Sequence, residues 1–183
     1  YVCDWYNPIK GHAQYSLRDE RRDRKSGRIW RIVPKGAKLT TPPRIAAEPV
    51  ARLLNILKRP EYRYRYWAKR ELRERNPQEV KVALDKWVGA LNSKDTRHRH
   101  HQMEAVWMYR NLEAENTQLL AELLDCEKPE ARAAATHQLR YWHASFKDGD
   151  ARLTKAANDK DPIVRMEAAI ATSYIGTPKA MDA

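Results

Sequence analysis

The sequence predicts a mainly α-helical protein of about four stacked helical pairs, preceded by a short β-hairpin. From residue 48 onward, Ala, Leu, Glu, Lys and Arg recur with helical spacing, and one pattern returns about every 33 residues. Before residue 38, β-branched and aromatic residues form two short runs bounded by Asn-Pro and glycine, which is typical of strands. We therefore expect a hairpin over 1–37, a linker over 38–47 and a helical repeat domain over 48–183.

The N-terminal segment consists of two strand-like runs separated by a long polar loop. The first run is YVCDWY, and the second is RIWRIV over residues 28–33, where both faces of the expected strand carry apolar side chains. Such a strand is typical of a sheet that is covered on both sides. Two strands alone are at best marginally stable in water, so we expect this hairpin to need further strands or a packing partner.

Four arginines define the helical repeat. They are Arg65, Arg99, Arg132 and Arg165, spaced 34, 33 and 33 residues apart. Pro129 and Pro162 precede the last two arginines by three residues and suit the first turn of a helix. Second helices are expected between these segments, over 78–91, 116–124 and 150–158. Helical pairs of this kind bury their apolar stripes only against neighbouring pairs, which predicts a solenoid.

The type of repeat is indicated by the last unit. The period is near the tetratricopeptide length of about 34 residues, but the Trp, Gly-Tyr and Pro pattern of that family is absent. The segment DPIVRMEAA at residues 161–169 instead resembles HEAT-like repeats. The sequence therefore predicts a HEAT-like α-solenoid.

Charge and cysteine content limit the functional classes. The formal net charge is +11, from 35 Lys and Arg against 24 Asp and Glu, which favours an acidic partner such as nucleic acid, anionic lipid or an acidic protein. The two cysteines, Cys3 and Cys126, exclude a disulfide framework and a CxxCH haem-attachment motif. No apolar run approaches the roughly 18 to 20 residues that span a bilayer.

The N-terminal segment also carries a family resemblance. The residues DWYNPIKGHAQYSLRDERRDRKSGRIWRI, followed by a proline-containing linker and HEAT-like repeats, resemble the membrane-bound dehydrogenases of the planctomycete and verrucomicrobial type. That family has a sorbosone/glucose dehydrogenase-like β-propeller, a HEAT-like domain and often a c-type haem domain. The resemblance implies that 1–37 is the closing hairpin of a propeller, in a parent protein that is periplasmic or secreted and carries a quinone cofactor and c-type haem.

On this resemblance we expect a non-catalytic scaffold. The helical region would position the propeller against a downstream electron-accepting domain or partner, with no catalytic residue and no cofactor in this chain. The alternative is a basic HEAT-like module that binds nucleic acid or an acidic protein. Both remain open from the sequence.

Two histidine-containing segments are weak candidates for a cation site. His12 and Asp19 share the hairpin loop, and loops on rigid scaffolds often carry function. His98 and His101 lie three residues apart in RHRHH and can reach one ligand from a single helix. No third ligand follows at a spacing typical of zinc sites, so we favour turn capping for the first segment and a helix start with a partly buried histidine for the second.

A stretch of mixed aromatic and basic residues is the strongest candidate for a binding surface. Residues 59–75, RPEYRYRYWAKRELRER, combine stacking side chains with cations, as a nucleic-acid surface requires. At helical spacing the same aromatics can form the core between repeats, with arginine stems packed over them, and we favour this interpretation. The candidate binding surface comprises Arg63, Arg70, Arg73, Arg97 and Arg110.

Overall fold

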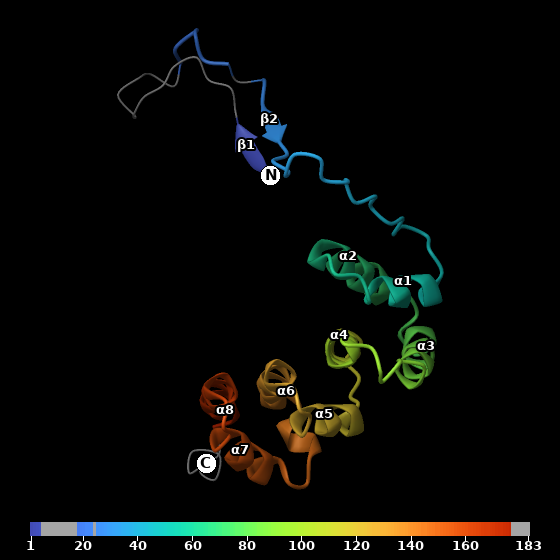
Figure 1. Ribbon diagram of the computed structural model, residues 1–183, viewed down its shortest axis with the longest axis vertical. Helices are drawn as coiled ribbons and strands as arrows, with labels where there is room; N and C mark the ends of the chain where they lie inside the picture. The colour runs from blue at the N-terminus through green and yellow to red at the C-terminus, as the bar shows by residue number, and fades with distance from the viewer. Residues whose placement is uncertain (5–17, 24, 177–183) are drawn as a thin grey trace. The chain divides into compact units, whose positions relative to one another are not determined.

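The computed structural model describes residues 1–4, 18–23 and 25–176, and it is mainly α-helical (Figure 1). Two compact units are distinguished, residues 1–41 and 42–183. The described helices are α1 (Val50–Ile56), α2 (Tyr62–Arg73), α3 (Pro77–Gly89), α4 (His98–Asn111), α5 (Thr117–Leu124), α6 (Pro129–Trp142), α7 (Gly149–Ala157) and α8 (Pro162–Ile175). A 3-10 turn over His143–Ser145 follows α6.

The N-terminal unit contains a two-stranded antiparallel sheet. Strand β1 (Val2–Asp4) pairs with β2 (Arg28–Trp30), with Cys3 opposite Ile29. Asp4 joins the strands, because its Oδ2 accepts a hydrogen bond from Trp30 Nε1 at 3.3 Å and lies 2.6 Å from Arg28 Nη2. The expected strand over 28–33 is therefore shorter than predicted, and its side chains are exposed rather than covered on both faces. Two strands provide no interior in which to bury them.

The helical unit has two layers. Figure 1 shows α2, α4, α6 and α8 along the inner side of a curved array, and α1, α3, α5 and α7 along its outer side. The chain alternates between layers, so each outer helix and the following inner helix form one pair. The four repeated arginines all lie on inner helices. The prediction of about four stacked helical pairs after a short hairpin is confirmed.

Helix starts follow the local sequence. Proline occupies the first turn of α3, α6 and α8, where its missing N–H has no helical partner to lose. The Asn76 side chain caps α3 by accepting from two backbone N–H groups, and Asn116 and Asp161 cap α5 and α8. Gly176 ends α8 with φ of 65°, a left-handed conformation that favours glycine.

The core lies between the two layers and repeats with the arginines. Ala68, Ala135 and Ala168 each stand three residues after a repeated arginine, and all three are fully buried. Small side chains at these positions allow the helices to approach closely. Leucines from outer helices complete the interior, among them Leu53, Leu84, Leu120 and Leu153. Where two pairs meet, their apolar faces thus cover each other, as a solenoid requires.

Candidate interaction surface

Three of the repeated arginines cap the turn that precedes their own helix. In each case Nη1 donates to two backbone carbonyls, six and five residues earlier. Arg132 donates to Cys126 O at 3.0 Å and Glu127 O at 3.3 Å. Arg165 and Arg65 make the corresponding pairs of hydrogen bonds, at 2.6 to 3.0 Å. Because carbonyls at a helix end lack helical donors, the guanidinium satisfies acceptors that would otherwise need water.

The same arginines connect successive pairs. Arg132 Nε and Nη2 donate to the two carboxylate oxygens of Asp159 at 2.8 and 2.9 Å, in the turn before the next inner helix. Arg99 does the same one repeat earlier, with Nη2 at 3.0 Å from Glu127 Oε2. Hydrogen bonds from these arginines lower the pKa of Asp159 and of Glu127. We call Arg65, Arg99, Arg132 and Arg165 the arginine ladder; the first three are paired with carboxylates of the fold.

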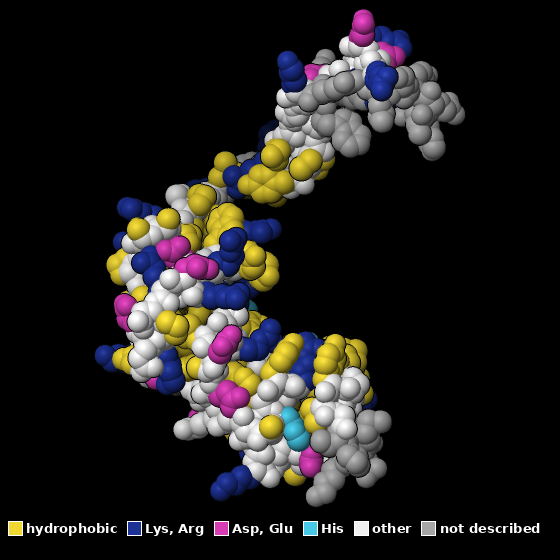
Figure 2. All heavy atoms as spheres, turned by 180° about the vertical axis from the view of Figure 1, so that it is seen from behind, with side chains coloured by type: hydrophobic (Ala, Val, Ile, Leu, Met, Phe, Trp, Pro, Cys, Tyr) yellow, Lys and Arg dark blue, Asp and Glu magenta, His cyan; other side chains and the backbone are white. Residues whose placement is uncertain are grey.

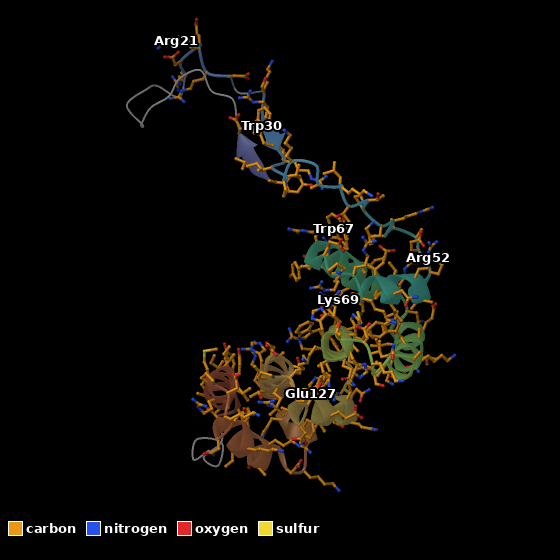
Figure 3. All side chains as sticks on the ribbon, in the orientation of Figure 1. Arg21, Trp30, Arg52, Trp67, Lys69 and Glu127 are labelled. Atoms are coloured by element: carbon orange, nitrogen blue, oxygen red, sulfur yellow. The ribbon has the colours of Figure 1, made fainter. Side chains whose placement is uncertain are left out.

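A buried ion cluster holds α2 against α4. Arg65 Nε lies 2.7 Å from Glu104 Oε1, and Lys69 Nζ lies 2.8 Å from Glu104 Oε2. The Glu104 side chain is only 1% exposed, so its charge is compensated entirely by these neighbours. Figure 3 labels Lys69 at this junction, where its ammonium also lies 5.2 Å from the centre of the Trp107 ring.

A strip of aromatic rings and arginines runs along the inner helices. Tyr141 and Tyr174 occupy equivalent positions of α6 and α8, 33 residues apart, and Trp107 lies on α4, one residue before the position equivalent to theirs. The Arg110 guanidinium lies 4.2 Å from the centre of the Tyr141 ring, and that of Arg140 lies 4.9 Å from the rings of both Tyr141 and Tyr174. We call these five residues the aromatic–arginine strip. Figure 2 shows basic and hydrophobic side chains next to each other along this side of the helical unit.

Positive charge is concentrated on the same layer. The four inner helices contain ten Lys or Arg and four Asp or Glu, a net charge of +6. The four outer helices contain five Lys or Arg and four Asp or Glu, a net charge of +1. Two of the ten cations, Arg99 and Arg132, are paired with Glu127 and Asp159 in the turns, outside this count. The remaining excess still favours anionic ligands on the inner layer over the outer one.

A hollow of about 400 Å³ adjoins the strip beside α4 and α6. Four basic or titratable side chains, from Arg97, Arg99, His100 and Lys128, line it together with the Trp107 ring. Glu130 is the one acidic residue in its lining. Burial lowers the pKa of His100, so its imidazole is neutral at pH 7. The hollow can receive an acidic side chain of a partner.

Residues 116–183 match the family model of HEAT repeats. This span contains α5 to α8, the pairs in which the arginine ladder is most complete. Neither a search of curated proteins nor a search of solved structures found a match. HEAT repeats are typical of scaffold and protein-interaction modules, and this is the functional class that the match supports. The match gives no support for a β-propeller or a dehydrogenase.

Within the described residues, no helix has the length and apolarity to cross a membrane.

The predicted binding residues lie on two inner helices, α2 and α4. Arg63 and Arg73 are exposed on α2, and Arg70 lies beside Glu71 and Glu74 in a shallow hollow. Arg97 and Arg110 stand at opposite ends of α4, about 20 Å apart along its axis. Arg97 donates to Lys58 O at 3.2 Å, whereas Arg110 belongs to the aromatic–arginine strip.

The aromatic side chains of α2 differ from the favoured interpretation. Tyr62, Tyr66 and Trp67 are exposed, so the prediction that they form the core between repeats is wrong; only Tyr64 packs against the core. The buried face of α2 is formed by smaller residues, Ala68 and Leu72 among them. Figure 3 labels Trp67 on this helix.

The candidate cation ligands do not converge. His101 is buried, and burial lowers its pKa, while His98 is half-buried at the start of α4. Asp19 accepts two hydrogen bonds from the Arg21 side chain, which lower the pKa of Asp19 to about 2. His12 lies outside the described residues. Within the ranges that the structure describes, no group of three His, Cys, Asp or Glu can hold a metal ion.

Tyr174 is the member of the strip that sequence reasoning missed. Trp107 and Tyr141 stand near helix ends, where large side chains commonly pack between repeats. Tyr141 is instead exposed, whereas the neighbouring Tyr109 and Trp142 are buried. Extending the 33-residue register from Tyr141 leads directly to Tyr174, so the repeat itself contained the signal.

Proposed function

We propose that this chain is a non-catalytic scaffold whose inner helices bind an acidic segment of a partner protein. The observation that carries the proposal is the concentration of positive charge on the inner layer, +6 against +1 on the outer layer. The rings of the aromatic–arginine strip add apolar contact area to this charge. Trp, Tyr and Arg are the residue types enriched among the energetically dominant positions of protein interfaces.

The strip suits a polypeptide with spaced carboxylates. Arg110 is exposed and held over the Tyr141 ring, so its guanidinium is oriented before a partner arrives. Preorganised side chains lose less entropy on binding. Charge complementarity would also accelerate association and make it sensitive to salt.

Nucleic acid is the second candidate, and the disposition of charge argues against it. Glu71 and Glu74 share a hollow with Arg70, which weakens any continuous phosphate-binding surface on α2. Arg65 and Arg132 are mostly buried, and their N–H groups donate to backbone carbonyls and carboxylates of the chain itself. A long phosphate backbone requires a row of free cations.

The parentage inferred from sequence gives this scaffold a specific setting. In a secreted or periplasmic quinoprotein-like sugar or alcohol dehydrogenase, it would hold a propeller against an electron-accepting domain, with the quinone and c-type haem bound elsewhere. The exposed apolar side chains in and after β2, such as Ile29 and Ile32, are consistent with packing against a further layer of structure. The chain alone should then reduce no electron-accepting dye with sugars or alcohols; turnover would contradict a non-catalytic role.

The binding proposal is tested with a fluorescent poly-glutamate peptide and a labelled DNA duplex, titrated with the full chain at several salt concentrations. The double variant Arg70→Ser/Arg110→Ser removes two inner charges, and Arg52→Ser/Lys86→Ser removes two from outer helices. We expect about five-fold weaker peptide binding for the inner variant, from about 0.5 kcal/mol per exposed ion pair, and little change for the outer one. Equal losses would refute the proposal. Tighter binding of DNA, with a steep salt dependence, would favour nucleic acid.

A further inference from the structure

The last inner helix, α8, exposes an apolar stripe. Its members are Ile163, Met166, Ile170 and Tyr174, with 55%, 52%, 37% and 69% of their surface exposed. Their spacing of three, four and four residues places them along one side of the helix. The opposite side of α8 is buried through Val164, Ala168 and Ala171. An apolar stripe of this kind on a helix indicates a packing surface.

Comparison of α8 with α6, one repeat earlier, indicates what the apolar stripe contacts. Helix α6 packs on α8 through Ala133, which clusters with Val164 and Ala168, and through His137, whose Nδ1 lies 2.8 Å from Glu167 Oε2. The positions 33 residues after Ala133 and His137 are those of Met166 and Ile170. The stripe therefore stands where α6 contacts its next inner helix.

The ion pairs of the arginine ladder also indicate that a helical pair can follow α8. Arg132 and Arg165 cap their turns through equivalent pairs of carbonyls, but Arg132 also pairs with Asp159 of the following turn. Arg99 pairs with Glu127 in the same manner. Among the residues that the structure describes, no carboxylate pairs with Arg165. A carboxylate in the turn of a following helical pair would occupy this position.

We propose that the exposed face of α8 binds a further HEAT-like helical pair. Its inner helix would carry small or aliphatic residues against Met166 and Ile170, and an Asp or Glu in the preceding turn would pair with Arg165. This face shares Tyr174 with the aromatic–arginine strip, but its chemistry is different: Met166 and Ile170 make it apolar, Arg165 is its one cation, and its partner is a folded helical pair instead of an acidic segment.

The test inserts a second copy of residues 144–176 between Gly176 and Thr177 of the full chain. The insertion places the copied Asp159 27 residues after Arg165, the same separation as that between Arg132 and Asp159. Amide hydrogen exchange of α8 is then compared with that of the original chain. We expect exchange to slow by about tenfold or more, because stacking in a solenoid stabilises the neighbouring repeat. Unchanged exchange, whether the copy folds elsewhere or remains unfolded, would overturn the proposal.

Two controls separate the ion pair and the stripe. Replacing only the copied Asp159 with Asn should remove part of the added protection, and Met166→Glu/Ile170→Glu in the original α8 should remove most of it. Both glutamates would replace exposed residues, so the original chain should still fold. Sedimentation of the unmodified chain tests a different occupant: a dimer that Met166→Glu abolishes would show that a second copy covers this face and would overturn the proposal.

Discussion

Replacing Arg132 with Met isolates the contribution of the arginine ladder to stability. The Arg132 side chain is 9% exposed and donates to Cys126 O, Glu127 O and both carboxylate oxygens of Asp159. Methionine keeps most of the apolar stem but deletes all four hydrogen bonds. The Asp159 carboxylate, 16% exposed, then loses its only ion-pair partner among the described residues. We expect a loss of about 3 kcal/mol, the lower end of the range for breaking a buried ion pair.

Arg165→Met is the matched control. Arg165 stands one repeat later and donates to the equivalent two carbonyls, at 2.8 and 3.0 Å. It is exposed, and no carboxylate in the described part of the chain pairs with it. Water can replace its hydrogen bonds, so we expect a loss of about 1 kcal/mol.

The two variants are compared by amide hydrogen exchange of α6 and α8 together with urea denaturation. A solenoid can open one repeat at a time, so site-resolved exchange is the more direct measurement. A difference of about 2 kcal/mol corresponds to about thirty-fold in the opening equilibrium. Losses that agree within about 0.5 kcal/mol would refute the argument that the ion pair to the next turn stabilises the stack.

Three further outcomes are expected. Burial lowers the pKa of His101, so the unfolded state binds the imidazole proton more tightly than the folded state does. The urea midpoint should therefore fall as the pH drops below about 6.5. The variant His101→Asn should flatten this decline, and a midpoint that does not depend on pH would contradict the prediction. Glu104→Gln should cost about 3 kcal/mol in urea denaturation because Arg65 loses its buried counterion, and a loss under about 1 kcal/mol would argue against that cluster. Cys3 is exposed whereas Cys126 is buried with a raised pKa, so a thiol reagent should modify Cys3 at once and Cys126 only in denaturant; equal rates would exclude this burial.

The sequence was sufficient for the helical array because its signals are local and repeated. Proline at the first turn, Asn or Asp at the cap and an arginine three residues into the helix recur, and the predicted second helices over 78–91, 116–124 and 150–158 correspond to α3, α5 and α7 within about two residues. The first outer helix, α1, was not separately resolved, since the residues around Val50–Ile56 carry neither a side-chain cap nor a repeated arginine.

The surface was harder to predict because exposure depends on neighbours distant in sequence. The aromatics of α2 have a spacing compatible with burial, yet Tyr62 and Trp67 face solvent. In the sequence, the repeated arginines could form a cationic surface. Arg65 and Arg132 are instead mostly buried, and their hydrogen-bond acceptors lie 5 to 39 residues away in the sequence. Periodicity identifies equivalent positions, but only the packed structure shows which of them remain available to a partner.

The forward direction of the arginine ladder gives the array a polarity. Arg132 holds its own turn and reaches the turn of the following pair, and Arg99 reaches the following turn in the same direction, so the two faces of a pair are chemically different and cannot be exchanged. Apolar contacts between inner helices tolerate sliding, because they have no preferred direction. A bidentate arginine–carboxylate pair tolerates little displacement. Apolar packing between neighbouring pairs and the alignment of those pairs are therefore separate properties. A one-residue insertion in a turn would disrupt the alignment but leave much of the apolar packing intact.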